Sequence, residues 1–206
     1  MLHLVTHPLV QDCLAELRDS GTAPERFRAL TNRVTVLLGA EALRDVPLAD
    51  GTVETPLGVS PCRRLAADVV LAPVLRAGLG MLPGMLELVP NARVGYLGLQ
   101  RDERTAVASQ YYAKLPANIE SSYVLLIDPM LATGGSAVAA LDVLTKAGAK
   151  YVRLVCIVAA PEGVAYVEKA YPTVPIFTPV VDRELNLHKF IVPGLGDFGD
   201  RLFGTV

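Results

Sequence analysis

Short apolar runs recur along the middle of the chain, separated by segments of mixed polarity. The near-continuous apolar runs Val69–Leu75 and Tyr123–Ile127 predict strands that are buried on both faces of a sheet. Runs rich in β-branched and aromatic residues predict three more strands, at Arg93–Leu99, Val152–Ala159 and Val174–Val181. All five lie between Ala67 and residue 181, so this part is expected to form the sheet.

The segments between these strands have helical spacing. Val138, Leu141 and Leu144 share one face of a helix predicted over Ser136–Ala147, and Gly148 is its expected stop. Two further helices are expected at Leu79–Leu88 and Glu162–Ala170. Strands that alternate with helices predict an α/β fold, a twisted parallel sheet flanked by helices.

The two ends of the chain differ from this middle part. Residues 8–45 are mostly helical in pattern and belong to an N-terminal helical and arm segment over about 1–60. The tail from Asn186 to Val206 is rich in glycine and contains Pro193, so an irregular flap is expected there. A length of 206 residues fits a single domain with such additions.

Composition excludes several classes of protein. Hydrophobic residues make up 51% of the chain and mean hydropathy is +0.39, which excludes intrinsic disorder. The longest stretch without acidic or basic residues, Pro129–Leu141, is too short to span a membrane. The first eleven residues carry no Lys or Arg, so a signal peptide is not expected. A net charge of −2 argues against nonspecific nucleic-acid binding.

Cysteine and histidine usage indicates neither a disulfide framework nor a metal centre. Cys13, Cys62 and Cys156 are far apart and form no CxxC pair, and the three histidines show no HExxH spacing. A reducing, cytoplasmic location fits this pattern.

The strongest chemical signal follows the strand Tyr123–Ile127. That strand ends at Asp128, and a helix begins near Thr133-Gly134-Gly135-Ser136. Ligands of parallel sheets bind beyond the carboxyl ends of the strands, and a helix start with nearby glycines favours a phosphate. The carboxylate of Asp128 can accept hydrogen bonds from the hydroxyl groups of a sugar on the same ligand. From the residues alone, a tight turn with Asp128 as a capping residue remains an alternative.

Two better-known glycine motifs do not explain the chain. No GxxxxGK[ST] sequence occurs, so a P-loop is excluded. Gly194–Gly199 matches GxGxxG, but only seven residues follow it. That leaves no room for the helix and strand of a dinucleotide fold, and a nicotinamide-dependent oxidoreductase is excluded.

The segment Asp128–Ser136, DPMLATGGS, resembles the phosphoribosyl-pyrophosphate (PRPP) motif of type I phosphoribosyltransferases, in the form found in uracil phosphoribosyltransferases. Further segments resemble that family in the same order: His7–Val10, Leu17–Asp19, Arg44–Asp45, Glu54–Pro56, Leu75–Gly80, Tyr111–Pro116, Ala159–Gly163 and Pro193–Asp197. The resemblance implies one phosphoribosyltransferase domain over 1–206, with a PRPP-binding core at 67–181 and a base-binding flap, or hood, at 182–206.

The resemblance also implies the reaction, in which uracil and PRPP give uridine monophosphate (UMP) and diphosphate in pyrimidine salvage. Arg76, Asp128 and Asp197 are the expected catalytic residues. The expected PRPP-binding residues are Arg76, Arg101, Asp128, Pro129, Met130, Leu131, Ala132, Thr133, Gly134, Gly135, Ser136 and Asp197. Arg76 and Ala77 would form a pyrophosphate loop with a strained peptide bond, and Asp102–Tyr112 a lid. Mg²⁺ is expected to bind mainly through PRPP oxygens and water, with no protein metal cage and with Asp197 as a candidate contact.

The base-binding residues implied by the resemblance are Ile191, Gly196, Asp197 and Phe198. Phe198 stands where the family usually has Ala, and Lys189-Phe190 where it usually has Gly-Tyr, so Phe198 is expected beside the base pocket without blocking it. A homodimer or homotetramer and a GTP effector are also implied. The alternatives are a pyrimidine-responsive RNA-binding regulator, which the acidic balance disfavours, and transfer to a different base.

Overall fold

The computed structural model describes residues 1–101 and 108–205, without the side chains at positions 100, 101, 108 and 109. The main sheet of this part has eight strands, seven of them in one path and β5 paired only with β4. The order along the path is β1 (Leu2–Leu4), β12 (Ile176–Thr178), β10 (Tyr151–Val155), β8 (Tyr123–Ile127), β4 (Val69–Leu75), β6 (Tyr96–Arg101) and β7 (Ala108–Lys114), with β5 at Arg93–Val94. All paired strands of this main sheet are parallel except β6 and β7, which confirms the predicted α/β class.

The central strands β4 and β8 have the predicted bounds, and three other predicted strands are shorter or divided. Gly95 divides β5 from β6 and donates its N–H to the Leu71 carbonyl at 2.8 Å. Strand β12 covers only three residues because Pro175 and Pro179 flank it and have no N–H to donate.

The predicted strand Val152–Ala159 leaves the main sheet after Val155. The N–H groups of Ile157 and Val158 both donate to the Pro129 carbonyl, at 2.9 and 3.1 Å. Strand β11 (Val158–Ala159) then pairs in parallel with β9 (Met130–Leu131). This short second sheet holds the segment that follows β8.

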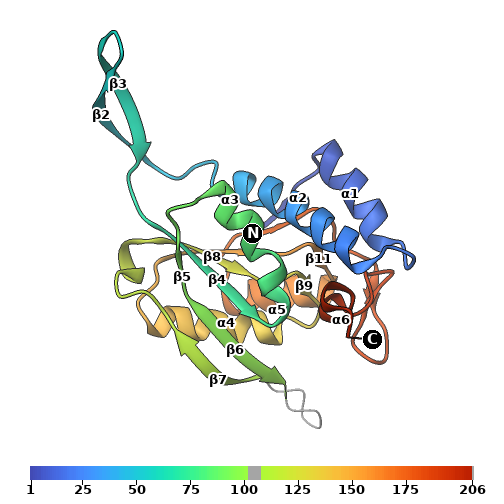
Figure 1. Cartoon of the computed structure of the whole chain (residues 1–206). Helices are drawn as coiled ribbons and strands as arrows, with labels where there is room; N and C mark the ends of the chain where they lie inside the picture. The colour runs from blue at the N-terminus through green and yellow to red at the C-terminus, as the bar shows by residue number, and fades with distance from the viewer. Residues whose placement is uncertain (102–107, 206) are drawn as a thin grey trace.

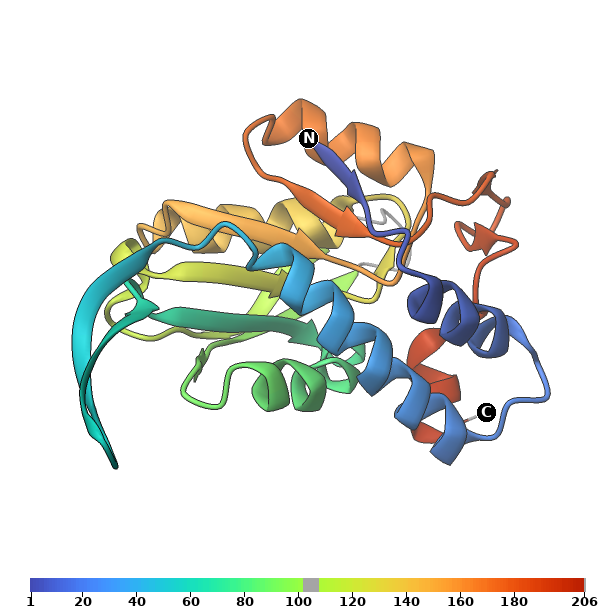
Figure 2. The ribbon, with the colours of Figure 1, turned by 90° about the horizontal axis from the view of Figure 1, so that it is seen from above.

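Helices cover both faces of the main sheet, as predicted (Figures 1 and 2). One face carries α1 (Pro8–Arg18), α2 (Pro24–Ala42) and α3 (Leu82–Leu88), and the other carries α4 (Gly135–Lys146) and α5 (Pro161–Ala170). Alternate residues of β4 separate the two cores. Val69 and Leu71 belong to the cluster with α1, α2 and α3, and Val70 and Ala72 to the cluster with α4 and α5.

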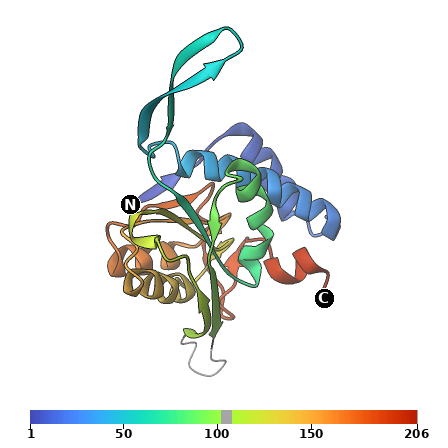
Figure 3. The ribbon, with the colours of Figure 1, turned by 60° about the vertical axis from the view of Figure 1, so that its left-hand side comes forward.

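The predicted arm is a β-hairpin that projects from the body of the molecule (Figures 1 and 3). Its strands are β2 (Leu48–Thr55) and β3 (Gly58–Leu65), so the arm extends beyond the expected limit near residue 60. Leu57 at its tip is fully exposed and Val59 is 75% exposed. Because neither face of the hairpin contacts the core, its sequence shows no regular alternation of apolar and polar residues.

The tail is more regular than predicted. Strand β14 (Ile191–Val192) pairs with β13 (Glu184–Leu185), which lies just before the tail, and helix α6 (Phe198–Phe203) follows. The expectation of an irregular flap was wrong over α6, where the Asp197 side chain caps the start and Gly204 ends the helix. Single-turn 3₁₀ helices lie at η1 (Ala77–Gly80) and η2 (Ile119–Ser121), so the helix predicted from Leu79 becomes α-helical only at Leu82. Within the described residues, no helix has both the length and the apolar character required to cross a bilayer.

Candidate active site

The loop after β8 is fixed by backbone hydrogen bonds to its neighbours. Half-buried Asp128 donates its N–H to the Val155 carbonyl at 3.2 Å. The Leu131 carbonyl accepts the Ala160 N–H at 2.8 Å, just before α5 begins. The loop is therefore held at the carboxyl edge of the sheet, where the sequence predicts it.

Gly134 turns the chain from this loop into helix α4. Its φ of 80° is left-handed, and a Cβ at this position would lie 2.9 Å from the Gly163 carbonyl oxygen. Gly134 is the N-cap of α4 and supplies no side-chain cap. The Gly135 N–H donates to Oγ1 of Thr133 at 3.5 Å, a long bond that an anion at the helix start can replace. The predicted cradle Thr133–Ser136 thus consists of a left-handed turn followed by a helix start, the backbone arrangement that many anion sites use.

A small cavity of about 30 Å³ lies in this loop. Its lining residues are Asp128, Met130, Leu131, Ala132, Thr133, Gly134, Ser136 and Ala137. Pro129 is buried and Gly135 begins the helix, so the predicted PRPP segment Asp128–Ser136 is brought together as one loop.

A second cavity, of about 390 Å³, lies between this loop and the tail. Its lining residues are Ala77, Met130, Ala132, His188, Lys189, Phe190, Ile191, Gly196, Asp197, Phe198 and Gly199. All four predicted base-binding residues line it. Met130 and Ala132 line both cavities, so the two cavities adjoin.

The loop at the end of β4 lies beside the end of β8. Arg76 is exposed and directly follows β4, and the Leu75–Arg76 peptide bond is cis. Gly78 packs so closely against the Ile127 carbonyl that an added Cβ would lie 2.5 Å from its oxygen. Arg76 is therefore on the same edge as Asp128, as predicted.

Two other predictions concern residues that lie partly or wholly outside the described part of the chain. Arg101 is the last residue of β6, and its side chain lies outside the described residues. Of the predicted lid Asp102–Tyr112, residues 102–107 also lie outside them. Tyr111 and Tyr112 lie in β7 and are exposed.

Asp197 and Phe198 have structural contacts as well as positions on the cavity. Oδ1 of Asp197 accepts the Asp200 N–H at 2.9 Å and so caps α6. Phe198 is only 2% exposed, and its ring meets the ring of Phe27 edge-on at 5.1 Å between centroids. The large residue at position 198 therefore joins the cavity wall to the core beneath it.

The turn between β13 and β14 lies in the predicted base-binding flap, but none of its residues was among the predicted base-binding residues. Lys189 has a φ of 65° and is the only non-glycine residue with a positive φ in the described part of the chain. Oδ1 of Asn186 accepts the N–H groups of His188 and Phe190 at 2.9 and 3.0 Å and closes the turn. In the sequence, this turn is noticeable because Lys189-Phe190 stands where the family usually has Gly-Tyr. No motif in the sequence indicates that the turn lines a cavity.

Cys156 lies near Asp128 but does not supply a nucleophile. Burial raises the pKa of its thiol to about 12, so the thiol stays protonated at neutral pH. Its Sγ lies 3.8 Å from the Phe177 carbonyl oxygen.

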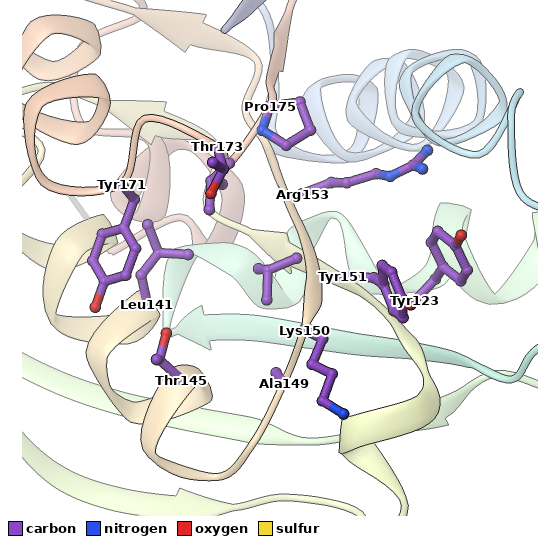
Figure 4. A pocket seen from close by; sticks show the side chains of 12 residues that line it. Tyr123, Leu141, Thr145, Ala149, Lys150, Tyr151, Arg153, Tyr171, Thr173 and Pro175 are labelled. Carbon is purple, nitrogen blue, oxygen red and sulfur yellow. The ribbon is translucent and has the colours of Figure 1, made fainter.

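Another cavity, of about 400 Å³, lies at the amino-terminal ends of β8 and β10 (Figure 4). Tyr123 and Tyr151 stack there at 5.0 Å, and Arg153 lies over the Tyr123 ring. The sequence-predicted site residues lie at the opposite, carboxyl edge of the sheet. This cavity is therefore separate from the loop and hood described above.

A mostly parallel sheet, a phosphate-type loop after β8 and a hood beyond it together define a type I phosphoribosyltransferase. The crystal structure of adenine phosphoribosyltransferase from Trypanosoma brucei shares this fold, with a TM-score of 0.55, 14% identity, and coverage of 86% of this chain and 82% of that one. A solved structure of a protein from Aquifex aeolicus matches with a TM-score of 0.95 and 39% identity over 98% of each chain.

Sequence comparison gives the family. The model of the uracil phosphoribosyltransferase family matches residues 4–205. Uracil phosphoribosyltransferase from Shouchella clausii is 50% identical, covering 99% of this chain and 98% of its own length. The Symbiobacterium thermophilum enzyme is 49% identical, with coverage of 98% and 97%. The chain belongs to the uracil phosphoribosyltransferase family and is an enzyme of that family.

Proposed function

We propose that the chain joins uracil to the ribose of PRPP at the two adjoining cavities, giving UMP and diphosphate. The 5′-phosphate would lie in the loop Thr133–Ser136. The base would lie in the cavity of about 390 Å³ between that loop and the tail, which we call the hood cavity. The observation that carries this proposal is that Met130 and Ala132 line both cavities. A phosphate, a ribose and a base held in one line would span them.

The reaction requires positioning more than reactive side chains. A ring nitrogen of uracil bonds to the anomeric carbon as the bond from that carbon to diphosphate breaks, through a transition state with oxocarbenium character. The proton of that ring N–H passes to the leaving diphosphate or to water. Fixed charges and hydrogen-bond donors suffice for such a step when the reactants are aligned. Asp128 would accept hydrogen bonds from the ribose hydroxyls, and its negative charge would favour the developing positive charge on the sugar.

Arg76 is proposed to bind the diphosphate part of PRPP, because a guanidinium group can bind phosphate oxygens through two donors. Arg76→Ala is expected to raise the KM for PRPP by roughly 10- to 100-fold, the loss of one or two charged hydrogen bonds. The KM for uracil should change much less. Steady-state kinetics with each substrate varied in turn measures both constants, and a larger rise in the uracil KM would contradict the assignment.

Mg²⁺ is proposed to enter with PRPP. Within the described residues, no group of three or more His, Cys, Asp or Glu side chains could hold a metal ion. Substrate oxygens and water would supply most ligands, which is usual for Mg²⁺. Oδ2 of Asp197 is not engaged in the cap of α6 and is a candidate contact. The ion would neutralise charge on the leaving diphosphate.

The base would be read by backbone groups of the hood at Ile191 and Gly196. Such groups can match the carbonyl and N–H pattern of uracil, and the exocyclic amine of cytosine would leave donors facing each other. A panel of radiolabelled bases with PRPP and Mg²⁺ tests this choice. Formation of UMP alone supports the proposal, and preferred transfer to another base would overturn it.

A homo-oligomer is proposed because the β2–β3 arm exposes apolar side chains at Leu57 and Val59. An isolated two-stranded hairpin is marginally stable, so a second copy of the chain is the expected cover. Light scattering is expected to give at least twice the chain mass of 22.0 kDa. Replacing both residues by Asp should shift the protein toward the monomer, and a wild-type monomer would contradict the proposal.

Activation by GTP and a cytoplasmic location remain part of the proposal. The first rests on the family resemblance and is tested by adding GTP to the assay at limiting PRPP. The second is supported by the free thiols of Cys13, Cys62 and Cys156, which suit a reducing compartment.

A further inference from the structure

The base-side wall of the hood has little regular structure of its own. Strand β14 has two residues, and the chain then passes through Gly194 and Gly196, both with positive φ, before the short helix α6. Such a segment keeps one geometry only if side chains from elsewhere hold it. Two arginines join it to the end of helix α1.

Arg18, the last residue of α1, makes the first connection. Its guanidinium donates to both carboxylate oxygens of Asp182, at 2.9 and 2.6 Å, and to the Gly194 carbonyl at 2.9 Å. Oδ2 of Asp182 also accepts the Gly194 N–H at 2.8 Å. Both backbone groups of Gly194 are thus bound by one ion pair, two residues before Gly196 on the cavity wall.

The Arg18–Asp182 pair is shielded from water. The Asp182 side chain is 4% exposed and the Arg18 side chain 25% exposed. A forked guanidinium fits a carboxylate in a single orientation, so the pair fixes direction as well as distance. A lysine at position 18 would keep the charge but lose this fork.

Arg201 on α6 makes the second connection. It donates to the carbonyls of Leu17 and Asp19 at 2.6 and 2.5 Å, and to the Leu195 carbonyl at 2.9 Å. Carbonyl groups at a helix C-terminus lack partners within the helix and favour a cation. Arg18 and Arg201 therefore connect the end of α1 to the hood at Gly194 and Leu195.

We propose that Arg18, through Asp182, is a positioning residue that sets the geometry of the base-binding wall. The described residues that line the hood cavity include neither of them, so the effect on the base must pass through Gly194. This inference rests on the proposed placement of uracil in that cavity. It predicts a defect in the use of uracil rather than of PRPP.

The test compares two arginine-to-lysine variants by steady-state kinetics. Arg18→Lys is expected to raise the KM for uracil about tenfold while the KM for PRPP changes less than about threefold. Arg26→Lys is the matched control, because Arg26 forms an equally forked pair with Glu16, at 2.5 and 2.7 Å, between α1 and α2. That variant should retain both constants.

Equal rises in the two KM values, or a loss of kcat alone, would overturn the positioning role. If Arg18→Lys does not fold by circular dichroism, Asp182→Asn is measured instead, since it keeps the side-chain shape. Failure of both to fold would assign the pair to stability and also overturn the proposal. Gly196→Ala distinguishes a failure of the positioning role of Arg18 from a failure of the proposed placement of the base. If it raises the uracil KM and Arg18→Lys does not, the positioning role fails; if neither does, the base placement fails.

Discussion

Asp128→Asn is expected to lower kcat by about 100-fold, equivalent to ~2.7 kcal/mol of transition-state stabilisation. A carboxylate that accepts hydrogen bonds from sugar hydroxyls contributes about 1.5–3 kcal/mol through each charged bond. The amide keeps the size of the side chain but removes the negative charge that faces the developing charge on the ribose. Initial rates at saturating uracil and PRPP measure the effect.

Asp68→Asn is the matched control for this result. Asp68 directly precedes β4 at the opposite end of the sheet and pairs with Arg93 at 3.0 Å, with 56% of its side chain exposed. Loss of this surface pair should leave kcat unchanged. Near-normal turnover of Asp128→Asn, in a protein that unfolds at the wild-type temperature, would remove Asp128 from the ribose site.

Phe198→Ala is expected to reduce the free energy of unfolding by about 3 kcal/mol, within the range for truncating a buried aromatic residue. The ring is 2% exposed and packs edge-on against Phe27, so its removal leaves a cavity between α6 and α2. The same change withdraws part of the hood cavity wall and should raise the KM for uracil. Denaturant unfolding and uracil kinetics measure the two effects.

Phe203→Ala on the same helix is the control, because its side chain is 43% exposed. It should cost no more than about 1 kcal/mol and leave the uracil KM unchanged. If Phe198→Ala retains wild-type uracil affinity and base preference, Phe198 serves the core alone and is not part of base recognition.

The sequence predicted the strands whose apolar pattern reflects burial on both faces. Val69–Leu75 and Tyr123–Ile127 had the observed bounds because every residue in them is buried except the half-buried Leu75 and Tyr123 at their ends. The sequence could not show that the chain leaves the sheet after Val155, since the Pro129 carbonyl that binds Ile157 and Val158 lies far away along the chain. Alternating polarity was absent from the β2–β3 arm because both of its strands are mostly exposed to solvent in the described part of the chain.

The candidate site was predicted where it lies on one continuous segment. Asp128–Ser136 carries its strand end, its turn and its helix start in nine consecutive positions, so spacing and the glycines were informative. The hood depends on tertiary contacts instead. Nothing near Arg18 in the sequence indicates Asp182 or Gly194, because the pairing arises only when the tail folds back on α1.

The most direct test of the account is a crystal structure of the protein with ribose 5-phosphate or UMP bound. The account predicts that the phosphate lies within hydrogen-bond distance of the N–H groups that open helix α4, with the Thr133 and Ser136 hydroxyls around it and the ribose at Asp128. A phosphate bound elsewhere, with the Thr133–Ser136 loop empty, would contradict it.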